Sequence, residues 1–223
     1  LPRLHVGDLV GLDDAHRPSV TPVPHRPRVV ERDRPRTYEG EPGGGDRYPG
    51  RMRSSYLDVV AERVVVFDGA TGTWIQSQDL SLDDYGGPAF EGCTDILGAT
   101  RPDVVAALHT AYLEVGADVV ETNTFGAFGV PLGEYDIPER AHELCVANAS
   151  IAREVADGFS TPDQPRFVAG SLGPGTKAPS LGQIRFADLR DAYEVACRGL
   201  LEGGVDLFIL ETHFDLLAVK AAV

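Results

Sequence analysis

The sequence predicts an α/β fold of the (β/α)8 TIM-barrel type, of which about the first four strand–helix units are present. Short apolar runs alternate with longer helix-forming stretches from residue 58 onward, and parallel strands need such helical connections. Polar residues follow the ends of these runs, where barrel enzymes place their active sites. A doubly wound sheet usually carries GxGxxG after its first strand, and Asp68-Gly-x-x-Gly-Thr73 lacks that spacing.

The first unit opens with Val64-Val65-Val66-Phe67, a β-branched run typical of a strand buried on both faces. Its helix is expected to begin after Thr100, which is a good N-cap residue. Pro102 suits the first turn, and Asp103 complements the positive end of the helix dipole.

The next units repeat this order. We expect further strands at residues 118–121, 166–169 and 206–210, with helices from about 138, over about 187–202, and from 216. A complete barrel takes about 250 residues. Residues 58–223 are therefore expected to be the N-terminal half of a barrel domain.

Residues 1–57 have a different composition. They hold half of the prolines of the chain and show no lasting 3.6- or 2-residue periodicity. Because proline removes hydrogen-bond donors and glycine adds chain entropy, we expect a disordered leader. Leu1 is not a methionine, so we do not expect it to be the natural start.

The charge and the cysteines limit the classes of function. A formal net charge of −14 argues against binding to nucleic acid or to anionic membranes. No apolar run reaches 18 residues, so no membrane-spanning helix is expected. Cys93, Cys145 and Cys197 are widely spaced and form no CxxC pair, which fits a reducing cytoplasm and predicts no metal ligands among them.

Three strand ends carry the candidate binding residues. Asp68 joins a turn in which Gly69 and Gly72, before Thr73, let backbone N–H groups converge on an anion. Asn123, two residues after Glu121, offers a donor and an acceptor to a ligand, or else ties the rim together. Glu211 ends a buried strand, so it must hold a cation, either a substrate ammonium or a basic side chain.

These strand ends resemble the homocysteine-binding domain of cobalamin-dependent methionine synthases. The resemblance covers about residues 64–223 and none of the first 57. Five segments in order carry it: Phe67-Asp-Gly-Ala-Thr-Gly-Thr73, Gly92-Cys-Thr-Asp-Ile-Leu97 with Arg101-Pro-Asp-Val104, Gly116-Ala-Asp-Val-Val-Glu-Thr-Asn-Thr-Phe125, Val168-Ala-Gly-Ser-Leu-Gly-Pro174 and Gly204-Val-Asp-Leu-Phe-Ile-Leu-Glu-Thr212.

The resemblance implies a barrel that binds homocysteine. Backbone groups around Asp68, Gly69 and the Gly72-Thr73 turn would receive its amino-acid end, Glu211 would hold its ammonium, and Asn123 would line the pocket. It also implies Zn²⁺ on three cysteines beyond Val223, and a methyl group from methylcobalamin in downstream folate, cobalamin and activation modules. The resemblance assigns no catalytic residue to this chain, which we expect to be inactive alone.

Three alternatives stay open. The barrel is shared with cobalamin-independent homocysteine methyltransferases that use betaine or S-methylmethionine. A barrel hydrolase would use carboxylates such as Asp68, Glu121 and Glu211 as acid and base. A half-barrel would instead be a non-catalytic binding module.

Overall fold

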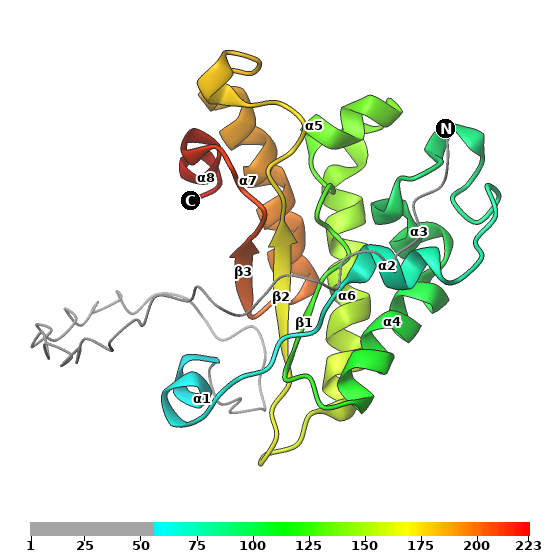
Figure 1. The fold of residues 1–223 in the computed structure, drawn as a ribbon, viewed down its shortest axis with the longest axis vertical. Coiled ribbons are helices and arrows are strands. Elements are labelled where there is room, and N and C mark those ends of the chain that lie inside the picture. The colour runs from blue at the N-terminus through cyan, green and yellow to red at the C-terminus, as the bar shows by residue number, and fades with distance from the viewer. Residues whose placement is uncertain (1–55) are drawn as a thin grey trace, which may run out of the picture. The chain divides into compact units, whose positions relative to one another are not determined.

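The computed structural model describes residues 56–223, which form an α/β fold around a small parallel sheet (Figure 1). The sheet has the order β1-β2-β3, so that strands adjacent in the chain are adjacent in space. Val120 pairs with Val168, and Ser171 pairs with Ile209. The three strands are β1 (Val119–Glu121), β2 (Phe167–Leu172) and β3 (Leu207–Leu210).

Helices connect the strands and cover one face of the sheet. Figure 1 shows α6 and α7 along that face, and α6 packs against both α4 and α7. The α-helices are α1 (Tyr56–Glu62), α2 (Thr71–Gln76), α3 (Leu97–Thr100), α4 (Pro102–Glu114), α5 (Gly129–Leu132), α6 (Ala141–Phe159), α7 (Phe186–Gly203) and α8 (Leu216–Ala222). Short 3-10 turns are η1 (Pro88–Phe90), η2 (Thr94–Ile96), η3 (Gly133–Tyr135), η4 (Pro138–Arg140) and η5 (Pro179–Leu181).

The predicted leader, residues 1–57, overlaps the described part of the chain only at residues 56 and 57. Residues 56 and 57 begin α1, and the remainder of 1–57 lies outside the part of the chain that the structure describes. Within residues 56–223, every helix is too short or too polar to cross a lipid bilayer.

The first expected strand is reduced to one parallel bridge, between Phe67 and Val119. Val64 is 82% exposed and Val66 is 52% exposed, so the prediction of burial on both faces is wrong for these residues. Among residues 56–223 this segment pairs with a strand on one side only. The Val66 N–H also donates to the Asp118 carboxylate (3.0 Å) rather than to a ladder carbonyl.

The start of α4 also differs from the prediction. Thr100 is the last residue of α3, and its hydroxyl donates back to the Ile96 carbonyl (3.3 Å). Arg101 is the N-cap residue, and no side chain caps the helix. Thr100 therefore ends one helix instead of capping the next, while Pro102 does occupy the first turn.

The alternation of strand side chains produces two apolar layers. Val120 and Val168 face the helices, in a cluster with residues of α4 and α6. Val119 and Phe167 belong to a separate cluster with Tyr56 and Val59 of α1. The Tyr56 ring meets the Phe167 ring edge-on, with centroids 5.6 Å apart. The helix α1 thus covers apolar side chains of the second layer.

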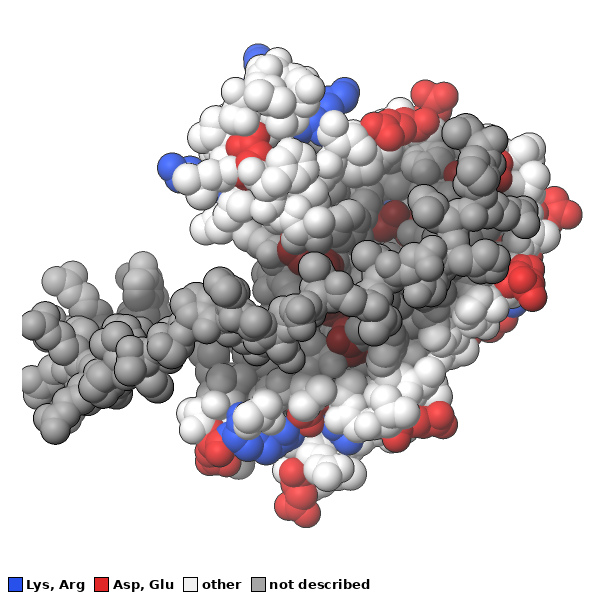
Figure 2. Space-filling model, viewed as in Figure 1, with Lys and Arg blue, Asp and Glu red and all other residues white. Residues whose placement is uncertain are grey.

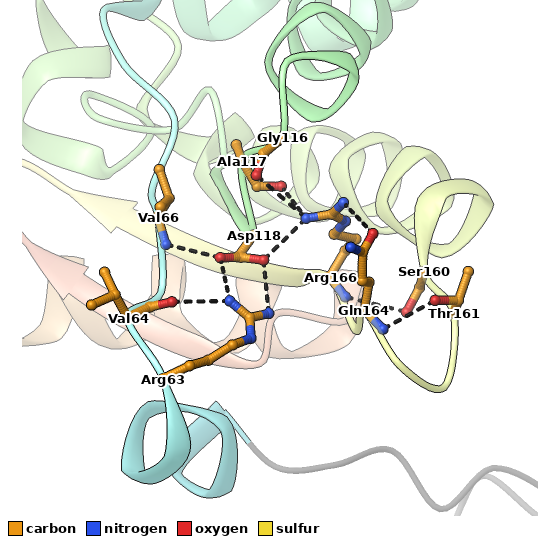
Figure 3. A network of polar contacts seen from close by, with 10 residues as sticks. All are labelled: Arg63, Val64, Val66, Gly116, Ala117, Asp118, Ser160, Thr161, Gln164 and Arg166. Carbon is orange, nitrogen blue, oxygen red and sulfur yellow. Dashed lines mark hydrogen bonds and ion pairs between the residues drawn. The ribbon is translucent and has the colours of Figure 1, made fainter.

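A network of ion pairs lies where the strands begin (Figure 3). The Asp118 carboxylate accepts two hydrogen bonds from Arg63, at 2.8 and 2.9 Å, and one from Arg166, at 3.0 Å. The hydrogen bond from Arg63 is the largest of the effects that lower the pKa of Asp118. Because Arg63 directly follows α1 and Arg166 directly precedes β2, this network joins α1 to the sheet.

Candidate functional site

A cavity of about 470 Å³ lies at the ends of the strands, opposite the network around Asp118. It is lined by Asp68, Gly69, Ala70, Thr71, Gly72, Thr94, Glu121, Thr122, Asn123, Thr124, Phe125, Ser171 and Glu211. Five of the six residues proposed from the sequence are in this set, and Thr73 is not. The structure therefore brings the acids of three strand ends into one cavity.

Asp68 follows the bridged segment and is held by backbone groups. Its Oδ2 accepts the N–H of Glu121 (2.9 Å), and its own N–H donates to the Val119 carbonyl (3.0 Å). Oδ1 is buried and has no hydrogen-bond partner among the described residues. Burial raises the pKa of Asp68 to about 7, with a smaller contribution from the charge of Glu211.

The expected flexible turn after Asp68 is the start of the helix α2. Gly72 is in its first turn, where a Cβ would meet no atom within 4 Å. At Gly69 a Cβ would lie 3.2 Å from the Tyr112 hydroxyl. The first N–H groups of a helix lack intrahelical acceptors, and no side chain caps α2. The backbone N–H groups after Asp68 therefore belong to the start of a helix rather than to a flexible turn.

Glu121 and Glu211 reach the cavity from β1 and from the end of β3. Burial is the largest of the effects that raise the pKa of Glu121 to about 7, and the charges of Glu211 and Asp68 contribute to the same shift. The Ser171 hydroxyl donates a hydrogen bond to Oε1 of Glu211. No lysine, arginine or histidine is among the residues that line the cavity.

The amide of Asn123 is engaged within the protein. Its Nδ2 donates to the Thr94 carbonyl (2.8 Å) and to Oδ1 of Asn148 (3.4 Å). Asn148 in turn donates to the carbonyls of Asp95 and Leu144. Both amide hydrogens of Asn123 are thus used in a hydrogen-bond network at the rim, which is the second of the two roles expected from the sequence. The side-chain oxygen of Asn123 is left for a ligand.

Sequence reasoning missed Ser171, because it ended this strand at residue 169. The strand β2 continues to Leu172, and a chain of hydroxyl contacts supports that extension. The Ser171 N–H donates to Oγ1 of Thr122 (3.0 Å), and Oγ1 of Thr124 donates to the Ser171 carbonyl (2.8 Å). The apolar Leu172 that follows Gly170 and Ser171 was the available signal for a longer strand.

The loop after β2 packs against the rim of the cavity. A Cβ at Gly173 would lie 2.7 Å from both the ring and the carbonyl oxygen of Phe125, a lining residue. The Tyr193 hydroxyl donates to the Gly173 carbonyl (2.8 Å). Only glycine allows this close approach, so Gly173 fixes the loop against Phe125.

The described residues do not fit a zinc ion. Residues 56–223 contain no group of three histidine, cysteine or acidic side chains arranged to hold a metal. Burial raises the pKa of the Cys93 thiol to about 11, and it raises the pKa of Cys145 and of Cys197 as well. Because metals bind the thiolate rather than the neutral thiol, these three cysteines are poor zinc ligands.

A parallel α/β fold with a polar cavity at the strand ends is the arrangement of an enzyme-type ligand site. A sequence model described as homocysteine S-methyltransferase matches residues 65–223, and the chain belongs to that family.

Figure 2 shows Asp and Glu over a wider area than Lys and Arg on one face, in keeping with the net charge of −14.

The curated relatives of this chain include two methionine synthases. The chain is 53% identical over 167 residues to the methionine synthase of Mycobacterium tuberculosis and 50% identical to that of Mycobacterium leprae. Each match covers 75% of this chain and 14% of the relative. The chain therefore spans a small part of the length of the curated relatives it matches.

Solved structures share the fold. The oxidized form of the homocysteine methyltransferase MmuM from Escherichia coli aligns with a TM-score of 0.60 and 18% identity, over 73% of this chain and 58% of that chain. Its metallated form aligns with a TM-score of 0.59 and 18% identity, over 73% and 59%. The small parallel sheet and its helices are thus similar to a homocysteine methyltransferase fold.

Proposed function

We propose that residues 58–223 bind the amino-acid end of homocysteine in a methionine synthase, which transfers a methyl group from methylcobalamin to the homocysteine thiolate. Membership of the homocysteine S-methyltransferase family supports this, as do the two methionine synthases at 50% identity or more. One observation of the structure carries it. The cavity gathers three carboxyl groups and no basic side chain, so it demands a cationic ligand group.

Glu211 is the proposed partner of the substrate ammonium. Its Oε1 is oriented by the Ser171 hydroxyl, which keeps the carboxylate in place for a charge-assisted hydrogen bond. The backbone around Asp68 and Gly69, with the first-turn N–H groups of Gly72 and Thr73, would receive the substrate carboxylate. Asn123 would contribute its oxygen.

The order of the strands supports a barrel of the (β/α)8 type. The bridged segment, β1, β2 and β3 are neighbours in chain order. A doubly wound sheet reverses its strand order at a switch point, and no reversal occurs among these four segments. We propose that they are the first strands of the barrel domain.

In this proposal, residues 56–223 neither activate the sulfur nor supply the methyl group. Zinc and methylcobalamin, with the folate, cobalamin and activation modules, would act from other parts of the full-length protein. The cysteines Cys93, Cys145 and Cys197 form no disulfide, which agrees with a cytoplasmic enzyme.

The test is methionine formation by the full-length protein from homocysteine and each of three donors. We expect methionine with methylcobalamin. Product with only betaine or S-methylmethionine would assign the protein to the cobalamin-independent enzymes. No methionine with any donor would overturn the proposal, and a hydrolase panel would then test the acids of the cavity.

A further inference from the structure

We propose that His213 is a positioning residue of this site: its ring fixes the backbone of Glu211, so that the Glu211 carboxylate stays where the substrate ammonium binds. The inference rests on the proposed function, because that function makes Glu211 the partner of the ammonium. The resemblance to methionine synthases gave His213 no role, and His213 is not among the residues that line the cavity. It therefore acts on the ligand only through Glu211.

A single backbone oxygen joins His213 to Glu211. The carbonyl of Leu172, the last residue of β2, accepts the backbone N–H of Glu211 (3.2 Å) and lies 3.2 Å from Nε2 of the His213 ring. A carbonyl oxygen has two lone pairs and can only accept. Nε2 is therefore the ring nitrogen that donates, and the Leu172 carbonyl holds Glu211 and His213 together.

The turn between Glu211 and His213 is strained. Thr212 has a φ of 59°, in the left-handed region, and its side chain is exposed. A β-branched residue adopts this conformation rarely, and it persists only where the surrounding contacts impose it. The turn brings His213 back to the carbonyl that Glu211 already uses, so the hydrogen bond from the His213 ring closes the turn.

The His213 ring lies near a rigid part of the core. Its centroid is 6.3 Å from that of Tyr193, which is 1% exposed and donates its hydroxyl hydrogen to the Gly173 carbonyl (2.8 Å). The other ring nitrogen of His213, Nδ1, is buried and has no hydrogen-bond partner within residues 56–223. The contact with Leu172 is thus the hydrogen bond that orients the ring in this part of the chain.

Glu211 is held at both ends by consecutive residues of β2. The Ser171 hydroxyl donates to its carboxylate, and the Leu172 carbonyl accepts its backbone N–H. A charge-assisted hydrogen bond reaches its full strength only where its partners are held in the productive geometry. Without the His213 contact, one backbone hydrogen bond alone must hold the strained turn, so the carboxylate loses orientation and homocysteine binds more weakly.

The experiment is calorimetric titration of the full-length protein with homocysteine, in the wild type and in three variants of His213. Gln carries an amide nitrogen near the position of Nε2 and keeps the donor to Leu172, whereas Asn is too short and Leu has no donor. We expect His213→Asn and His213→Leu to bind homocysteine about two- to tenfold more weakly, the range for the loss of one neutral hydrogen bond. His213→Gln should stay within about twofold of the wild type, because it keeps that bond.

Two backgrounds test whether His213 acts through Glu211. In Glu211→Gln the charged partner of the ammonium is already lost, so adding His213→Asn should weaken binding by less than about twofold. In Glu154→Gln, which changes an exposed acid of α6, the same replacement should keep its full effect. A merely structural role of His213 would give the same loss in both backgrounds.

Thr110→Val is the matched control for the loss of a hydrogen bond to a carbonyl. The Thr110 hydroxyl donates to the Ala106 carbonyl (2.8 Å) within α4, and Thr110 is not among the lining residues of the cavity. We expect this variant to bind homocysteine like the wild type. A loss equal to that of His213→Asn would overturn the inference.

Three further results would overturn the inference and leave the proposed function standing. They are wild-type affinity in His213→Asn, an equal loss in His213→Gln and His213→Asn, and a full loss in the Glu211→Gln background. Where His213→Leu fails to fold, His213→Asn carries the same comparison, because it keeps a polar side chain in the loop. Absence of homocysteine binding to the wild type would overturn both the inference and the proposed function.

Discussion

The backbone N–H of Glu121 donates a hydrogen bond to Oδ2 of Asp68 across 2.9 Å. This contact joins the end of β1 to the segment that leads into α2, and it places two carboxyl groups at one cavity. Glu211 adds a third from the far side of β2. The acidic character of the site therefore follows from how the strands pair, because each acid ends or follows a paired segment.

Replacing Glu211 by Gln in the full-length protein is expected to raise the KM for homocysteine. The change keeps the shape and removes the charge-assisted hydrogen bond to the ammonium, which is worth about 1.5–3 kcal/mol, or about ten- to a hundredfold in KM. Steady-state kinetics with varied homocysteine measure it, with Glu154→Gln as the control. An unchanged KM in Glu211→Gln would remove this residue from the ammonium site.

Replacing Asp118 by Asn is expected to destabilise the fold. Asp118 has a side chain only 8% exposed and pairs with Arg166, itself 10% exposed. Losing one partner of a largely buried pair leaves the other charge uncompensated, at a cost of about 2–4 kcal/mol. Urea denaturation measures the free energy of unfolding. The exposed pair Arg185–Asp188 provides the control. We expect Asp188→Asn to have the same free energy of unfolding as the wild type. An equally small effect of Asp118→Asn would refute the role of the network.

His109 is expected to make the fold sensitive to mild acid. It is fully buried on α4, neither ring nitrogen has a hydrogen-bond partner among the described residues, and burial lowers its pKa to about 4. The unfolded state, with a pKa near 6.5, binds the proton first. Stability is therefore full above about pH 6.5 and is lost as the pH falls toward about 4, by about 3 kcal/mol.

The variant His109→Leu removes this titration and keeps an apolar side chain in the core. We expect its free energy of unfolding to fall less than that of the wild type between about pH 6.5 and 4. Parallel curves for His109→Leu and the wild type would contradict the assignment.

Gly199 is expected to be required for the packing of α7 against α6. A Cβ there would lie 2.7 Å from the His142 carbonyl oxygen and 2.8 Å from the Cys145 Cβ. Gly199→Ala should lower the free energy of unfolding by about 1–3 kcal/mol, as overpacked cores do. Gly158 of α6 has no atom within 4 Å of an added Cβ, so Gly158→Ala should be neutral or stabilising by up to about 1 kcal/mol. Equal effects of the two changes would contradict this packing.

Three of the four expected strands, and the meeting of strand-end residues in one cavity, could be predicted from the sequence. The apolar runs around Val120, Val168 and Phe208 are strands, and the polar residues that follow them do meet in one cavity. This worked because parallel pairing brings all carboxyl ends of the strands to one edge of the sheet. Asp68, Asn123 and Glu211 could be placed together on that ground alone.

What sequence reasoning missed depends on contacts between distant residues. Nothing local to Val66 shows that its N–H would be taken by the Asp118 carboxylate. Thr100 has the composition of an N-cap, and only the preceding helix α3 makes it a helix end. The engagement of the Asn123 amide likewise requires Asn148, which is 25 residues away in the sequence.

The central claim is that this cavity recognises the amino group of homocysteine. The most direct measurement compares binding of homocysteine with binding of 4-mercaptobutanoate, which lacks only the amino group, to the full-length wild type and to Glu211→Gln. We predict that the wild type binds 4-mercaptobutanoate at least about tenfold more weakly than homocysteine, and that the ratio falls toward one in Glu211→Gln. Equal affinity of the wild-type protein for the two compounds would contradict the account.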